Sequence, residues 1–224
     1  MAVSDKEEKL IILSAPSGAG KSTIINLLNR FYEIDSGTIS IDGTNINEYT
    51  LESLRKQIAV VLQDVFLFAD TIYNNITLYN PEITEEMVIN AAKEIGIHEF
   101  IMSLPNGYQY NVKERGVMLS SGQRQLIAFL RAYISNPHIL IMDEATSSID
   151  TYSEELLQRA TETITKGRTS IVIAHRLATI MNASKIIVMD KGQIVEEGKH
   201  TDLILKENGY YKKLYDSQFS LVID

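Results

Sequence analysis

Short apolar runs rich in β-branched residues alternate along this chain with longer stretches whose apolar residues recur at helical spacing. Three of the short runs, Lys9–Ser14, Ile58–Leu62 and Ile139–Met142, have the length and composition of buried strands. Two of the longer stretches, Ser22–Phe31 and Ser121–Ser135, have the spacing of helices with one apolar face. Strands that alternate with helices favour an α/β fold with a mainly parallel sheet, because parallel neighbours need a crossover connection.

The same pattern continues through the rest of the chain. The dipeptide Asp42-Gly43 predicts a small hairpin over residues 38–46, since it suits a tight turn between strands. The remaining expected elements are a strand at Thr169–Ala174, a hairpin of Lys185–Met189 with Gln193–Glu196, a helix at Glu154–Lys166, a helix from Thr84 to near Gly96, and a helix or helix pair at Thr201–Ser217. We expect one domain, with a core of residues 1–80 and 137–224 and a helical insertion at 81–136.

Composition excludes several classes of function. The 224 residues carry a formal charge of −8, and such an acidic chain is a poor binder of nucleic acid because phosphates repel it. The sequence has no cysteine, which excludes disulfides, thiolate zinc sites and cysteine nucleophiles. The longest apolar runs have five residues, whereas a membrane span needs about 18. We expect a cytoplasmic protein that binds no nucleic acid and reaches a membrane only through a partner.

A glycine-rich loop, Ala15–Thr23, lies between a predicted strand and a predicted helix. In that position, backbone N–H groups and the helix N-terminus can surround phosphate oxygens. Lys21 would reach the β- and γ-phosphates, and Ser22 would place its hydroxyl on Mg²⁺. Ala15 stands where the strict phosphate-loop pattern has its first glycine. The alternative is a flexible surface loop before a helix.

Polar residues follow three of the predicted strands. Asp143 and Glu144 come directly after Ile139–Met142, at the sheet edge where α/β proteins bind ligands. Asp143 suits Mg²⁺, and Glu144 suits the general base that orients the attacking water. Gln63 follows the strand Ile58–Leu62, and it could bind Mg²⁺ and contact that water. His175 follows the strand Thr169–Ala174, and it could donate a hydrogen bond to a γ-phosphate. For each residue the alternative is an ordinary solvated side chain at a strand end.

The string Leu119–Gln123 opens the predicted helix Ser121–Ser135. Ser120 and Gln123 have the spacing of a capping box, in which each side chain bonds to the backbone of the other residue. The alternative function is anion binding at the helix N-terminus.

Taken in order, these motifs resemble the nucleotide-binding domain of an ABC transporter from about Ile24 to Ser220. Such a domain has a P-loop NTPase (RecA-like) core with a mainly parallel sheet and an inserted helical subdomain. The segments Phe66–Ile76, Leu104–Gly116 and Gly209–Ser220 resemble the half-transporter exporters of lipids and drugs. In that branch, the ATPase domain normally follows a membrane domain on the same chain.

The resemblance implies a role for each matching residue. It implies a site for ATP and Mg²⁺, with Gln63 as the Q-loop residue and Asp143 as the Walker B acid. It also implies Glu144 as the catalytic base and His175 as the switch histidine. Asp150 corresponds to the D-loop at the dimer interface. The implied nucleotide-binding residues are Ser17, Gly18, Ala19, Gly20, Lys21, Ser22 and Thr23 of the phosphate loop, with Ser120, Gly122 and Gln123 of the signature that contacts ATP on the opposite subunit.

The N-terminal residues point elsewhere. Lys9–Thr23 resembles the opening of guanylate kinase, and we expect the N-terminal β-subdomain of an ABC domain to be truncated. Met1–Ser14 contains no aromatic residue that could stack on adenine, so we expect weak nucleotide binding with little base selectivity.

Three functions follow from these observations. The first is an ATP-hydrolysing exporter domain that dimerises head to tail around two ATP, alone or with a membrane domain. The second is a guanylate kinase that transfers phosphate from ATP to GMP. The third is a non-catalytic chimeric or designed module with the ABC fold.

Overall fold

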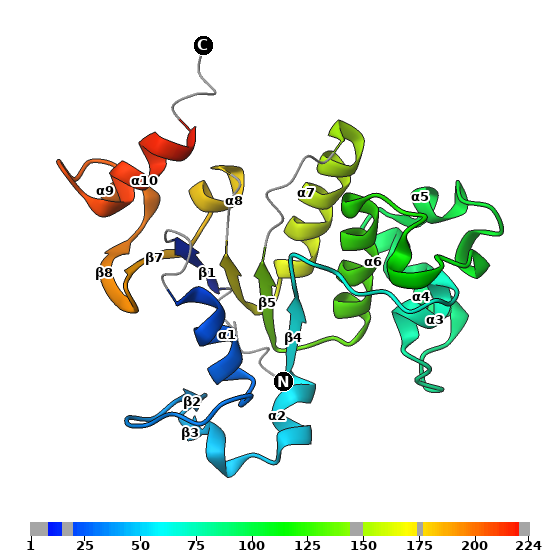
Figure 1. The fold of residues 1–224 in the computed structure, drawn as a ribbon, viewed down its shortest axis with the longest axis horizontal. Helices are drawn as coiled ribbons and strands as arrows, with labels where there is room; N and C mark the ends of the chain where they lie inside the picture. Colours follow the sequence, from blue (N-terminus) through cyan, green and yellow to red (C-terminus); the bar gives the residue numbers. More distant parts are fainter. Residues whose placement is uncertain (1–8, 15–19, 144–149, 174–176, 220–224) are drawn as a thin grey trace, which may run out of the picture. The chain divides into compact units, whose positions relative to one another are not determined.

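The structure, a computed structural model, describes residues 9–14, 20–143, 150–173 and 177–219 (Figure 1). The chain forms two compact units. The first contains residues 1–59, 138–144 and 168–224, and the second contains residues 60–137 and 145–167. The predicted helical stretch 81–136 falls wholly in the second unit, while the domain limits at 81 and 136 remain a prediction.

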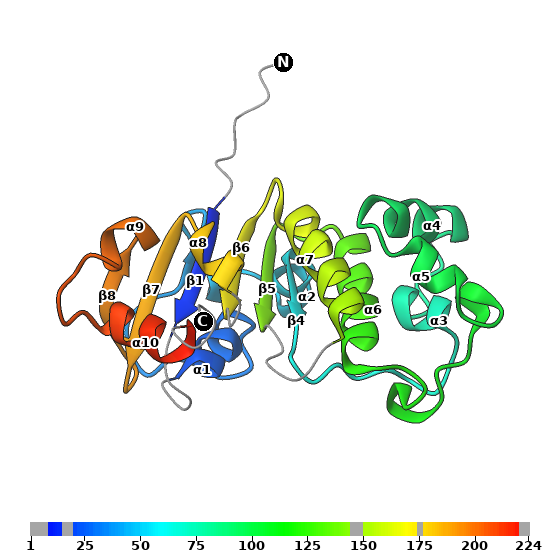
Figure 2. The ribbon, with the colours of Figure 1, turned by 90° about the horizontal axis from the view of Figure 1, so that it is seen from above.

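A six-stranded sheet has the strand order β4-β5-β6-β1-β7-β8. Its strands are β1 (Lys9–Ser14), β4 (Ile58–Val61), β5 (Ile139–Asp143), β6 (Thr169–Ile173), β7 (Lys185–Asp190) and β8 (Gln193–Gly198). Strand β1 pairs in parallel with β6 and β7, β5 pairs in parallel with β6, and β8 runs antiparallel to β7 (Figure 2). The predicted mainly parallel α/β sheet is therefore confirmed.

The core of the first unit is centred on β1. Ile12 pairs with Val172 on one side and with Ile186 on the other, and all three side chains are fully buried. Strand β1 is thus a central strand, with a parallel neighbour on each side.

The elements after β1 begin with α1 (Lys21–Leu28), β2 (Ser40–Ile41), β3 (Thr44–Asn45), the 3₁₀ turn η1 (Ile46–Glu48) and α2 (Leu51–Gln57). Strands β2 and β3 form the predicted hairpin, with positive φ at both Asp42 and Gly43. The predicted end of the first helix at Phe31 is wrong, because Arg30 adopts φ 49° and ends the helical path. Phe31 is 58% exposed and lies under the guanidinium of Arg55, at 4.9 Å from the ring centroid, rather than in the core.

The C-terminal part of the first unit contains α8 (Leu177–Met181), α9 (His200–Leu203) and α10 (Tyr210–Phe219). The predicted C-terminal helix or helix pair is thus a pair. The carboxylate of Glu196 on β8 accepts a hydrogen bond from the backbone N–H of Tyr211, at 2.8 Å. The Tyr211 hydroxyl also lies 2.7 Å from Nδ1 of His200, and these two contacts fasten α10 to the hairpin and to α9.

The second unit is mostly helical. Its elements are α3 (Ile72–Thr77), α4 (Glu85–Glu94), α5 (His98–Met102), the 3₁₀ turns η2 (Gly107–Gln109) and η3 (Glu114–Gly116), α6 (Ser121–Ile134) and α7 (Thr151–Thr165). Helix α6 carries the core residues Leu126, Ile127 and Leu130, all fully buried, and it lies beside α7 (Figure 2). Of the helices that the structure describes, none is both long enough and apolar enough to cross a bilayer.

Candidate nucleotide site

Three parallel strands bring their carboxyl ends to one edge of the sheet in the first unit. They are β1, β5 and β6, and their registers place Asp143 opposite Ile173. The loops that follow these strands, residues 15–19, 144–149 and 174–176, lie outside the described residues. The predicted site residues Ser17, Gly18, Ala19, Glu144 and His175 fall in these loops.

The structure describes the predicted phosphate loop, Ala15–Thr23, from Gly20 onward, and Gly20 lies directly before α1. Gly20 has φ 97°, a left-handed conformation that strongly favours glycine. Because glycine has no side chain, α1 begins without a side-chain cap. The backbone N–H groups of Thr23 and Ile24 donate to the Gly20 carbonyl, at 3.1 and 3.3 Å. The positive end of the helix dipole at the start of α1 is therefore suited to an anion.

The oxygen donors predicted for Mg²⁺ have the chemistry that this ion prefers. Ser22 is exposed in the first turn of α1, and Asp143 is half-buried at the last position of β5. Gln63, in the second unit, is exposed two residues after β4. A hydroxyl, a carboxylate and an amide carbonyl are hard ligands, so these residues fit the ion. The Lys21 side chain lies outside the part of the chain that the structure describes.

The capping box predicted at the start of α6 is confirmed. The Ser120 hydroxyl oxygen accepts from the backbone N–H of Gln123 at 3.2 Å, and the Gln123 side-chain oxygen accepts from the backbone N–H of Ser120 at 3.0 Å. Ser120 is exposed, whereas Gly122 is buried. Ser120 thus lies exposed at the start of a 14-residue helix.

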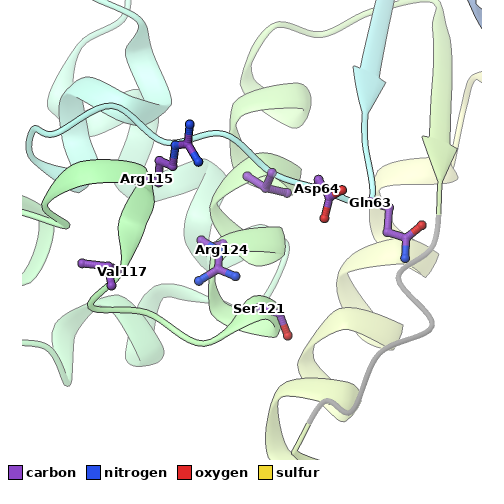
Figure 3. Close-up of a pocket in the computed structure, with 7 residues that line it drawn as sticks. Gln63, Asp64, Arg115, Val117, Ser121 and Arg124 are labelled. Atoms are coloured by element: carbon purple, nitrogen blue, oxygen red, sulfur yellow. The ribbon is translucent and has the colours of Figure 1, made fainter.

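A pocket of about 440 Å³ lies beside this helix start in the second unit (Figure 3). Gln63 and Asp64 reach it from the segment after β4, and Ser121 and Arg124 reach it from the first turn of α6. The other lining residues are Val65, Arg115 and Val117. Sequence reasoning named Gln63 but missed both arginines. Arg124 could have been found by projecting the first turn of α6, whereas Arg115 lies in a 3₁₀ turn with no periodic signal.

Asp150 begins α7 as its N-cap. Its carboxylate oxygen accepts a hydrogen bond from the backbone N–H of Ser153, at 2.8 Å. This hydrogen bond favours the ionised form and lowers the pKa of Asp150 below its ordinary value. The described geometry therefore gives Asp150 a local structural role as a helix cap.

Comparison with known proteins identifies the family. The family model described as ABC transporter matches residues 2–147 of this chain. The match extends further towards the N-terminus than the start near Ile24 expected from the motifs, and it includes residues 9–23. The guanylate kinase alternative therefore has no support from the comparisons.

The similar proteins are longer than this chain. A multidrug export ATP-binding/permease protein of Staphylococcus aureus strain NCTC 8325 / PS 47 is 51% identical over 202 residues, which are 90% of this chain and 35% of that protein. Its counterpart in the bovine strain RF122 / ET3-1 is 50% identical over 202 residues, with the same two coverages. The chain spans about a third of the length of these curated relatives.

A solved structure gives the same result. A bacterial Atm1-family ABC exporter with ATP bound matches 96% of this chain and 37% of that chain, with a TM-score of 0.86 and 41% identity. Because the identity is high, the likeness extends beyond the fold to the sequence. The chain therefore belongs to the ABC transporter family.

Proposed function

We propose that two copies of this chain close head to tail around two ATP molecules. The phosphate loop of one copy, Gly20–Thr23, would hold the triphosphate, and Ser120 of the other copy would contact the γ-phosphate. The observation that carries this proposal is the capping geometry of exposed Ser120. Its oxygen accepts the cap hydrogen bond with one lone pair, so its proton can still be donated to a phosphate oxygen.

Within each site the residues have distinct tasks. Lys21 neutralises charge on the β- and γ-phosphates. Glu144 accepts a proton from the attacking water while the water oxygen bonds to the γ-phosphorus and the bond from that phosphorus to the β–γ bridging oxygen breaks, so that ADP leaves. His175 donates a hydrogen bond to the γ-phosphate. Ser22, Asp143 and Gln63 are the residues that would hold Mg²⁺. When bound, this ion neutralises charge on the β- and γ-phosphate oxygens.

The partner in a membrane is proposed from an exposed apolar surface in the second unit. Phe66, Phe68, Leu78 and Tyr79 are 55%, 48%, 49% and 65% exposed, and the first two rings form an edge-to-face pair. Exposed aromatic clusters mark interaction surfaces. The relatives are named as ATP-binding and permease proteins, so we assign this surface to the cytoplasmic end of an exporter membrane domain. The chain would then work at the cytoplasmic face of the membrane.

The dimer is tested with Glu144→Gln, which removes the base while keeping the volume of the side chain. The variant should bind ATP, elute as a dimer when ATP and Mg²⁺ are present, and elute as a monomer when they are absent. Its hydrolysis rate should fall by roughly 10²–10⁴-fold. Glu155→Gln, at an exposed position of α7, is the matched control and should keep the parent rate. A monomeric Glu144→Gln with ATP bound would contradict the proposal.

A further inference from the structure

The segment Phe66–Phe68 is held by a buried polar side chain. Asn75 on α3 has no exposed surface. Its side-chain oxygen accepts from the backbone N–H of Phe68 at 2.8 Å, and its side-chain nitrogen donates to the carbonyls of Phe68 and Thr71 at 3.1 and 3.0 Å. Because every one of these contacts is made to backbone, Asn75 fixes the path of the chain irrespective of the side chains at 66–68.

Arg131 fastens this arrangement to α6. Its Nε donates to the carbonyl of Asn75 at 2.8 Å, and its Nη1 donates to the carbonyl of Phe66 at 3.5 Å. Its Nη2 is buried and has no hydrogen-bond partner among the residues that the structure describes. Burial also lowers the pKa of Arg131 below its ordinary value. Burying a guanidinium that lacks part of its hydrogen bonds costs desolvation free energy, which offsets what Arg131 contributes to the stability of the fold.

The other end of the segment is fixed as well. The backbone N–H of Ile72 donates to the carbonyl of Tyr110, and the N–H of Val112 donates to the carbonyl of Asp70, both at 3.0 Å. The chain from Phe66 to Ile72 is therefore tied to α6, to α3 and to the loop that leads to Arg115. Gln63 comes three residues before Phe66 and is itself exposed.

We propose that Arg131 is a positioning residue for Gln63, and that it makes the Gln63 segment move as one body with the signature helix. This inference rests on the proposed function, in which Gln63 and Ser120 both act on ATP. Ser120, the N-cap of α6, and Arg131 are eleven residues apart, which corresponds to about 16 Å of helix. The helix is thus a rigid connection between the signature end and the backbone at Phe66.

The test compares Arg131→Met, Arg131→Lys and the control Arg159→Met in the full chain. Methionine keeps the apolar stem but cannot donate to the two carbonyls, whereas lysine keeps the charge and N–H donors on a single nitrogen. Arg159 is exposed on α7, so its loss removes a charge without removing an anchor. The readouts are hydrogen exchange of a peptide covering residues 62–70, ATP binding, and the maximal rate of hydrolysis.

We expect Arg131→Met to speed exchange across residues 62–70 while α6 keeps its protection. Its kcat should fall about 10- to 100-fold, as misplaced catalytic groups do, with ATP affinity unchanged. Arg131→Lys should recover part of both effects, and Arg159→Met should match the parent. Parent-like exchange in Arg131→Met would overturn the inference, and so would faster exchange with parent kcat.

A parallel Gln63→Ala variant separates this inference from the proposed function. Reduced kcat in Gln63→Ala together with parent kcat in Arg131→Met would reject the role of Arg131 alone. Parent kcat in Gln63→Ala would remove Gln63 from the reaction and overturn this inference, while the head-to-tail dimer would still stand or fall on the Glu144→Gln experiment.

Discussion

Replacing Ser120 separates its structural role from its role toward ATP. Ser120→Ala removes the 3.2 Å cap hydrogen bond to Gln123, while the return bond from the Gln123 side chain to the backbone of residue 120 can persist. Loss of an N-cap costs about 1 kcal/mol. In a chain of this length that corresponds to a fall in Tm of about 2–4 °C. Ser120→Asp keeps the cap, because aspartate accepts from the same N–H and favours the helix dipole, so its Tm should equal or exceed that of the parent.

Ser120→Ala and Ser120→Asp should rank in the opposite order when ATP hydrolysis is measured. A hydrogen bond to a charged group contributes about 1.5–3 kcal/mol, so Ser120→Ala should lower kcat/KM roughly 10- to 150-fold. Ser120→Asp should lose more, since it places a carboxylate where a γ-phosphate must approach. Calorimetric unfolding and steady-state ATPase measurements on the same preparations give both orders. Parent-like ATPase in Ser120→Asp would refute the assignment of Ser120 to the partner's nucleotide and leave it as a cap alone.

Two further predictions concern stability. Gly116 has φ 67°, and a Cβ there would lie 2.8 Å from Cδ1 of Leu67, so Gly116→Ala should lower the free energy of unfolding by about 1–3 kcal/mol in urea titrations. Gly43→Ala, at φ 82° with open space around it, should lower the free energy of unfolding by less. Equal decreases in the two variants would show that the Leu67 side chain moves aside at little cost. Burial raises the pKa of Tyr211 from 10.0 to about 12, so the fold favours the neutral phenol and loses stability as pH rises from 10 towards 12. In Tyr211→Phe, the free energy of unfolding from denaturation curves should fall less between pH 10 and 12. An unchanged dependence on pH would assign the loss of stability to other groups.

The elements that sequence predicted well are those set by neighbours along the chain. The capping box depends on two residues three positions apart, and the hairpin depends on a dipeptide that tolerates positive φ. Strands β5 and β6 were found because consecutive residues on both of their faces are buried, which demands apolar runs. Helix α2 was missed because its seven residues bury only Leu54, which leaves no apolar period to detect.

The anchoring of the Gln63 segment could not be read from sequence. Arg131 and Asn75 are 56 residues apart, and the arginine bonds to a backbone carbonyl, which any residue provides. The type of the acceptor residue therefore does not reveal the contact. The end of α1 was misplaced for a related reason, because the apolar Phe31 fits the helical period but lies against Arg55 instead.

The most direct test of the head-to-tail site mixes two inactive chains. Ser120→Asp keeps the phosphate loop and loses the signature, whereas Lys21→Ala keeps the signature and loses the phosphate loop. Each variant alone should be nearly inactive. In an equal mixture half of the dimers are mixed, and each contains one complete site, so about a quarter of the parent ATPase rate should return. A mixture no more active than the two variants separately would contradict the claim that each ATP is held between two copies.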